Sequence, residues 1–353
     1  VFPYTTRCRY HALSGALRGR VLARPHPRPG DPPPAVMTAA GFLAGGFPDL
    51  DVVLSFVSPL AYLTLHRGPT HSLILAPFWA LLLAWVFSLV WRRYAWRAFY
   101  GVALGGILIH ILGDWITSFG TLMLWPVSDH RFALSTTFII DLWFTGIIVA
   151  GLIAAALWRG SRAPALAGLA VLAAYVGMQG YARHEALAIG RAQAPDAVAV
   201  TALPRPASPF NWMVIVDAGD RYLHANVRTV EGVPLLARAS AWIARLAAPY
   251  VTPDRAEWQV AYKFGRDTET RAVAEAAWRS PGLAFFRWFA EAPLAVDVRQ
   301  GNPSTCVWFQ DLRFLTPGRD QWPFRYGACR TGTDPEWRAY EWNDGAPALL
   351  ERG

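Results

Sequence analysis

The chain of 353 residues is 54% hydrophobic and only 16% charged, which excludes an ordinary water-soluble protein and indicates a membrane protein. Its formal net charge of +8 comes from arginine, since Lys263 is the single lysine. Arginines beside apolar runs usually orient a protein in the bilayer, so we do not interpret this charge as nucleic-acid binding. Cys8, Cys306 and Cys329 lack the spacing of a zinc-binding motif, so thiolates are not expected as metal ligands.

The first 34 residues form an N-terminal segment that is rich in arginine and proline and contains one short helix. They lack the uninterrupted apolar core of a cleavable signal peptide. Their apolar stretch, His11–Ala23, is interrupted by Arg18 and Arg20, and a second short stretch, Ala35–Phe47, ends at Pro48. Because a membrane-spanning helix needs about 20 apolar residues, we predict that both stretches are half-helices or tilted helices packed against others.

Four longer apolar runs follow within residues 35–185, which we predict to be a transmembrane helical domain. They are Ser72–Trp91, Trp96–Ile116, Phe138–Trp158 and Ala163–Tyr181. The expected fold is therefore an all-α membrane bundle of about four full spans plus the two shorter N-terminal helices.

The arginines between these helices predict an orientation in a bacterial inner (plasma) membrane. Cytoplasmic loops are enriched in Lys and Arg, which puts three arginine groups in the cytoplasm. These groups are Arg18, Arg20, Arg24 and Arg28; Arg92, Arg93 and Arg97; and Arg159 and Arg162. Alternating spans then put the histidines and aspartates of the helical domain, and everything after Tyr181, on the outer side.

Residues 186–353 have shorter apolar runs and strand-like alternation, which predict a soluble, extracytoplasmic α+β domain. We expect a hairpin from Phe210–Val216 and Tyr222–Val227, with an aromatic segment, Leu283–Phe289, that packs on the bilayer or on the helical bundle. Cys306 and Cys329 lie on consecutive strand-like segments, so a disulfide and two buried thiols are both open alternatives. Further helices are expected at Leu235–Leu246 and Ala272–Trp278, and further strands at Val296–Arg299, Cys306–Phe314 and Pro323–Cys329.

Three short motifs place ionisable residues within or beside the apolar runs, where such residues are costly and are functional candidates. In HILGD, His110 and Asp114 are four residues apart and share one face of a helix. FPDLD holds Asp49 and Asp51, and HRGPTH holds two imidazoles on either side of a Gly-Pro turn, namely His66 and His71. Taken alone, each motif has a structural alternative: a buried His–Asp pair, a turn with a helix cap, and a polar cap at the membrane interface.

The predicted depth and side of these motifs bring them together, and this favours a metal site. Mixed ligation by His and Asp suits zinc, or manganese, better than magnesium. Such an ion lowers the pKa of a bound water to about 7 and supplies hydroxide for hydrolysis, while Asp51 or Asp141 could accept the proton. Arg67 and Arg131 are candidates to hold an anionic group of the substrate, and Thr70 is a helix cap or a further substrate contact.

The motifs also carry a family resemblance. HALSGAL at residues 11–17, FPDLD at 47–51, HRGPTHS at 66–72, HILGD at 110–114 and MLWPVSDHRF at 123–132 occur in this order. With them the chain resembles the YdjM family of membrane-bound proteins, which are assigned as metal-dependent hydrolases. The resemblance covers about residues 10–160, and the remainder resembles the C-terminal extension of longer members. It implies a divalent-metal site formed by His11, Asp49, Asp51, His66, His71, His110 and Asp114.

The predicted function is therefore metal-dependent hydrolysis by an integral membrane protein. A more distant likeness to zinc-dependent phospholipase C favours a phosphoester of a membrane lipid or other envelope substrate. The first rival is a non-catalytic membrane scaffold with a structural His/Asp cluster and an outer domain that binds a partner. The second is a transporter, which is disfavoured because the polar residues lie near one face and the sequence has no inverted repeat.

Overall fold

A computed structural model describes residues 4–56, 58–231, 241–301, 304–318, 323–332, 334–343 and 346–350. The chain forms two compact units. Unit 1 comprises Val1–Glu185, Leu203–Trp212 and Thr229–Ala248, and unit 2 comprises Ala186–Ala202, Met213–Arg228 and Pro249–Gly353. The chain is thus helical in its N-terminal region and rich in sheet in its C-terminal region, which confirms the prediction of a helical region followed by a region that contains strands.

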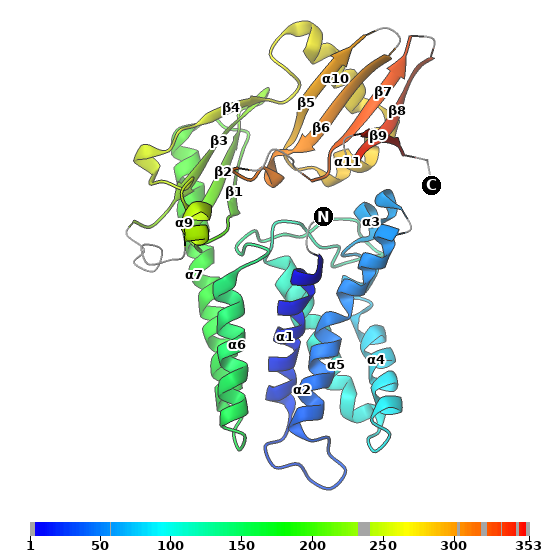
Figure 1. The fold of residues 1–353 in the computed structure, drawn as a ribbon, viewed down its shortest axis with the longest axis vertical. Coiled ribbons are helices and arrows are strands. Elements are labelled where there is room, and N and C mark those ends of the chain that lie inside the picture. Colours follow the sequence, from blue (N-terminus) through cyan, green and yellow to red (C-terminus); the bar gives the residue numbers. More distant parts are fainter. Residues whose placement is uncertain are drawn as a thin grey trace. The chain divides into compact units, whose positions relative to one another are not determined.

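The helices of unit 1 are α1 (Tyr4–Leu22), α2 (Pro34–Gly46), the 3₁₀-helix η1 (Pro48–Phe56), α3 (Pro59–Leu65), the 3₁₀-helix η2 (Pro69–His71), α4 (Ala76–Val90), α5 (Trp96–Trp115), α6 (Leu142–Leu157) and α7 (Ala163–Gln193). The last of these continues beyond unit 1 into unit 2. Helices α1, α2, α4, α5, α6 and α7 run side by side in unit 1, and a long segment, residues 116–141, connects α5 to α6 (Figure 1).

The expectation of about four full spans is not confirmed. By length and composition, α5 and α7 are long and apolar enough to cross a membrane, and the number rises to four only if each of two bent helix pairs is one span. The pairs are α2 with η1, bent by 41°, and Pro59–His71 with α4, bent by 76°. Ser72 contributes to the second break, because its hydroxyl accepts the backbone N–H groups of Ile74 and Leu75 and holds the turn that precedes α4.

Helices α1, α2 and α5 approach closely because small residues line their contacts. A Cβ atom built on Gly15 would collide with the carbonyl of Gly41, and a Cβ on Gly41 would collide with the carbonyl of Gly15. On α5, a Cβ on Gly106 would lie 2.8 Å from the Cβ of Ala44. This close approach places polar side chains of separate helices in direct contact at one end of the group.

The C-terminal region contains two sheets. The first has the order β1 (Ala199–Pro204), β2 (Asn211–Asp217), β3 (Arg221–Arg228) and β4 (Gln259–Tyr262). The second has the order β5 (Pro293–Gln300), β6 (Ser304–Asp311), β7 (Tyr326–Thr331), β8 (Asp334–Asn343) and β9 (Ala346–Leu349). The adjacency of β2 and β3 confirms the predicted hairpin. Among the described residues, the further α-helices are α9 (Ala241–Ala247), α10 (Thr268–Arg279) and α11 (Ala284–Phe289), and the further 3₁₀-helices are η3 (Pro253–Arg255), η4 (Pro281–Leu283) and η5 (Leu312–Phe314). Residues 235–240 of the helix expected at Leu235–Leu246 lie outside the described residues.

Two features of unit 2 concern residues that the sequence singled out. Cys306 and Cys329 are directly opposite each other on β6 and β7 and form a disulfide. On α11, Phe286 and Phe289 are buried whereas Phe285 and Trp288 are half-buried, and the expected packing of this segment on the bilayer or on the helical bundle stays a prediction. The Phe286 ring lies 5.9 Å from that of Trp278 and 5.2 Å from that of Tyr326, so this residue contributes to the core of unit 2.

Candidate metal centre

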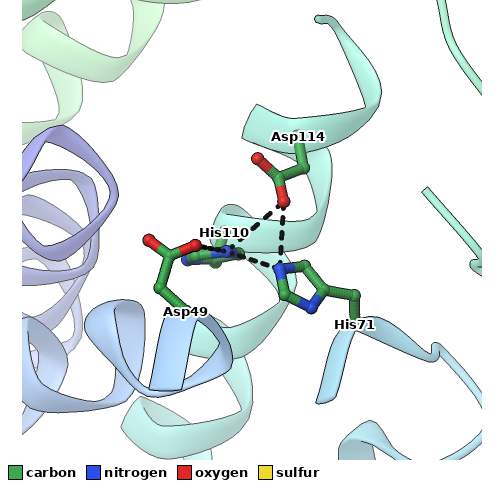
Figure 2. A group of neighbouring side chains, drawn as sticks. All are labelled: Asp49, His71, His110 and Asp114. Atoms are coloured by element: carbon green, nitrogen blue, oxygen red, sulfur yellow. Dashed lines mark hydrogen bonds and ion pairs between the residues drawn. The ribbon is translucent and has the colours of Figure 1, made fainter. Parts of the chain in front are cut away.

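Four side chains from three separate segments converge at one point in unit 1. Asp49 comes from η1, His71 from η2, and His110 and Asp114 from successive turns of α5 (Figure 2). One ligand atom of each residue lies within 4.8 Å of those of the other three. His71, His110 and Asp114 are fully buried, and Asp49 is 9% exposed, so a charge here is shielded from water.

The orientation of His110 is set by a backbone carbonyl. Its Nδ1 atom lies 2.6 Å from the carbonyl oxygen of Gly45. Because a carbonyl only accepts hydrogen bonds, the proton of the neutral ring must be on Nδ1, and Nε2 presents a lone pair to the centre. A partner of this kind commonly orients a histidine that binds metal.

His71 is held in the same way by oxygen atoms behind it. Its Nδ1 lies 2.9 Å from the hydroxyl of Thr70 and 3.5 Å from Oδ2 of Asp51. This favours a proton on Nδ1 and again leaves Nε2 as the free acceptor.

The atoms that meet at the centre are consequently all acceptors. The two Nε2 atoms of His71 and His110 are 3.0 Å apart, and Oδ2 of Asp114 lies 3.0 Å from the first and 3.5 Å from the second. Oδ1 of Asp49 lies 3.6 Å from Nε2 of His110. Facing lone pairs and carboxylate charges repel at such distances, and one shared proton relieves only one of these contacts. A divalent cation placed among these atoms would relieve the repulsion, and imidazole nitrogen and carboxylate oxygen are ligands that zinc accepts, so this donor set fits a divalent cation.

Asp114 is also held from its other side. Its Oδ1 atom lies 3.1 Å from Nε2 of His11 and 2.8 Å from a terminal nitrogen of Arg67. Arg67 also donates to the hydroxyl of Thr117, and its side chain is 4% exposed. The ring of His11 packs against that of His110 at 4.1 Å. His11 and Arg67 therefore fix the position of the Asp114 carboxylate and balance its charge.

Asp51, predicted as a ligand and as a proton acceptor, lies behind the cluster. Its carboxylate is 2.9 Å from Nδ1 of His66 and accepts the backbone N–H of Arg67 at 2.9 Å. The ring of His66 stacks on Tyr62 at 4.5 Å, while Thr70 lies between Asp51 and His71. In this arrangement His66 and Thr70 orient Asp51, and Asp51 orients His71.

We expect Asp51→Asn to weaken metal binding 10- to 100-fold without unfolding the protein. The physical reason is that the amide no longer supplies the charge that holds the Nδ1 proton of His71, which lowers the basicity of Nε2. Competition with a fluorescent chelator on the purified full chain would measure the change. An affinity within twofold of the wild type would show that Asp51 has no part in orienting the ligand.

Two other predicted site residues are not brought to the cluster. Asp141 caps α6, since one carboxylate oxygen accepts the backbone N–H groups of Trp143 and Phe144. Its other oxygen accepts the hydroxyl of Tyr175 and the side-chain amide of Gln179 on α7, at 2.8 and 2.9 Å. Arg131 donates to the carbonyls of Phe119 and Gly120, and its guanidinium lies 4.9 Å from the Phe119 ring.

Two glycines that shape the centre were not predicted from the sequence. Gly45 supplies the carbonyl for His110, and a Cβ on Gly113 would lie only 2.7 Å from the His11 ring. Both occur inside helices beside a predicted ligand motif, where glycine is unfavourable unless another group approaches closely. A glycine inside a helix next to such a motif is therefore the sequence feature that could have identified them.

Comparisons with known proteins show the family of the chain. The profile of the YdjM inner membrane protein family matches residues 7–186, which include all four residues of the cluster. The chain belongs to this family. Its similarity to the uncharacterized protein YfhP of Bacillus subtilis (strain 168) is 26% identity over 172 residues, which cover 48% of this chain and about half, 51%, of that protein. No solved structure matches the chain significantly. This YdjM member is therefore an inner membrane protein with a His/Asp group that could hold a metal ion.

Proposed function

We propose that this YdjM member is a metal-dependent hydrolase that cleaves a phosphoester of a lipid or another envelope substrate. The observation that carries the proposal is the convergence of four buried acceptors, His71 Nε2, His110 Nε2 and carboxylate oxygens of Asp49 and Asp114, with no donor among them. A divalent ion bound there, most simply zinc with manganese as the alternative, would act as a Lewis acid and activate water.

The residues around the centre divide the remaining tasks. His11 and Arg67 hold Asp114, and Asp51 with Thr70 holds His71, so the donor set is oriented before substrate arrives. Oδ2 of Asp49 is buried and has no hydrogen-bond partner among the described residues, whereas the oxygens of Asp51 and Asp141 accept hydrogen bonds from their neighbours. We therefore assign proton acceptance to Asp49 rather than to Asp51 or Asp141.

An anionic substrate group needs a cation beside the centre, and Arg131, although outside the cluster, contacts the same ring as Arg67. Arg67 and Arg131 lie against the same buried ring, with their guanidinium carbons 5.1 and 4.9 Å from the centroid of Phe119. Because Arg67 is already paired with Asp114, we assign contact with the substrate to Arg131 and electrostatic support to Arg67.

Phosphodiesterase activity of the purified full chain in detergent tests the function. We expect hydrolysis of a chromogenic phosphodiester and of a phospholipid to fall more than 100-fold after removal of metal by a chelator, and to return on addition of zinc. A carboxylic ester serves as a comparison substrate. Failure of the metal-loaded protein to hydrolyse any of the three would favour the non-catalytic scaffold.

We further propose that the C-terminal domain lies on the outer side of the membrane. Two observations support this orientation: the α1–α2, α4–α5 and α6–α7 loops, which carry the arginine groups, lie at the same end of unit 1 (Figure 1), and Cys306 pairs with Cys329. Arginine-rich loops are usually cytoplasmic, and disulfides persist in oxidising compartments.

A C-terminal fusion to alkaline phosphatase, which is active only outside the cytoplasm, is expected to be active in cells. The matched C-terminal fusion to green fluorescent protein is expected to show no fluorescence, because the C-terminus would lie outside the cytoplasm. A fluorescent fusion together with an inactive phosphatase would place the domain in the cytoplasm and overturn the orientation.

A further inference from the structure

A basic hollow lies at the arginine-rich end of unit 1, between the α1–α2 loop and the α6–α7 loop. Its lining includes Arg24, His26 and Arg28 from the first loop, Ser161 and Arg162 from the second, and Leu166 from the first turn of α7. The metal centre lies away from the hollow. His11, which contacts Asp114 of the centre, is in the first half of α1, whereas the loop that lines the hollow begins after the end of α1 at Leu22. The hollow is therefore separate from the proposed hydrolytic site.

Two arginines tie the loops into one rim. Arg20 donates to the carbonyl of Arg159 at 2.7 Å and to that of Ser161 at 3.2 Å. In return, Arg162 donates to the carbonyl of Ala23 at 2.6 Å. These acceptors are neutral backbone groups, so the bonds position both guanidinium groups without neutralising their charge.

The charge of the two loops is strongly unbalanced. Residues 23–33 and 158–162 contain four arginines, and Asp31 is the one acidic residue in their sequence. Asp31 accepts a hydrogen bond from the Arg24 side chain at 2.7 Å and from the backbone N–H of Arg28 at 3.0 Å. It thus orders the first loop but leaves an excess of positive charge around the hollow.

The first loop is stiff, because prolines alternate with its charged residues in the sequence Arg-Pro-His-Pro-Arg-Pro from Arg24 to Pro29. Proline restricts the backbone angle φ, so less conformational entropy is lost when the arginines close on an anion. Apolar side chains flank the same helix ends: Leu157, Trp158 and Leu166 are 72%, 62% and 51% exposed.

We propose that this hollow binds the phosphate headgroup of an anionic phospholipid. The arginines match the headgroup charge, as basic pockets between membrane helices do on the cytoplasmic side. The exposed apolar residues beside the rim offer a surface for the acyl chains, which a free phosphate ion lacks. A lipid bound here would clamp α1 and α2 to α6 and α7 at the end away from the metal centre.

Lipid-dependent thermal stability of the full chain in detergent tests the proposal. Phosphatidylglycerol is expected to raise the melting temperature, whereas phosphatidylcholine and inorganic phosphate at the same concentration are not. The double variant Arg24→Gln with Arg28→Gln should weaken the apparent affinity for phosphatidylglycerol roughly 30-fold, because two cationic contacts are lost. Its melting temperature without lipid should match that of the wild type, since Arg24 and Arg28 are exposed.

The matched control is Arg92→Gln with Arg93→Gln, which removes the same charge from exposed residues of the α4–α5 loop outside the hollow. This variant should keep the wild-type affinity. Equal weakening in both variants would show a diffuse charge effect and overturn the site. An equal response to phosphatidylcholine, or to inorganic phosphate, would overturn the assignment to an anionic phospholipid. None of these outcomes depends on metal binding or hydrolysis.

Discussion

Replacing His71 or His110 by alanine is expected to leave the purified protein almost free of bound metal. Each substitution removes one of two imidazole Nε2 atoms that lie 3.0 Å apart, and with it a ligand that neighbouring oxygen atoms already orient. Loss of groups that merely orient a ligand costs 10- to 100-fold in metal affinity, so loss of the ligand itself should cost more than about 100-fold. Elemental analysis of protein purified without added chelator measures the metal content directly.

The control for this experiment is His130→Ala, which removes an exposed histidine outside the cluster. It should retain the metal content of the wild type. Well-folded wild-type protein that contains no divalent metal, even after incubation with zinc, would contradict the proposed centre. It would favour a structural cluster in which protons shared among the side chains replace the ion.

Arg67→Met is expected to destabilise the protein by about 3–5 kcal/mol, since it leaves a buried carboxylate without its cationic partner. The Arg67 guanidinium lies 2.8 Å from Asp114, and the two side chains are 4% and 0% exposed. Asp114→Asn should have an effect of similar size for the converse reason, because the guanidinium is then buried without its anion. Thermal unfolding of chelated protein in detergent measures these effects without a contribution from metal.

The double variant Arg67→Met with Asp114→Asn separates the ion pair from general damage to the fold. We expect it to be more stable than the sum of the single changes predicts, because neither partner is left as an isolated charge. Arg93→Met, at an exposed position, should change stability by less than about 0.5 kcal/mol. Additive effects of Arg67→Met and Asp114→Asn would show that the pair makes no coupled contribution.

The two halves of the fold follow from local patterns, and the sequence was sufficient to predict them. Long apolar runs predict the helices that became α5 and α7, and alternation around the Ala218-Gly219-Asp220 turn predicts the hairpin of β2 and β3. The number of spans was less predictable. Apolar length does not reveal that the chain bends by 76° between Pro59–His71 and α4, where the hydroxyl of Ser72 holds a turn at the start of an apolar run.

The sequence by itself determined which residues are available for a metal centre: Asp49, His71, His110 and Asp114 all occur in motifs recognisable from residue type and order. Only the tertiary structure decided their tasks. Asp51 supports His71 while His66 and Arg67 occupy its oxygens, and Asp141 caps α6 locally while Tyr175 and Gln179 of α7 occupy its other oxygen. The direction of each imidazole likewise depends on a carbonyl or hydroxyl brought close by glycine-lined helix contacts and by the turn at Gly68 and Pro69. Such long-range contacts depend on how the helices pack, and no local stretch of sequence encodes them.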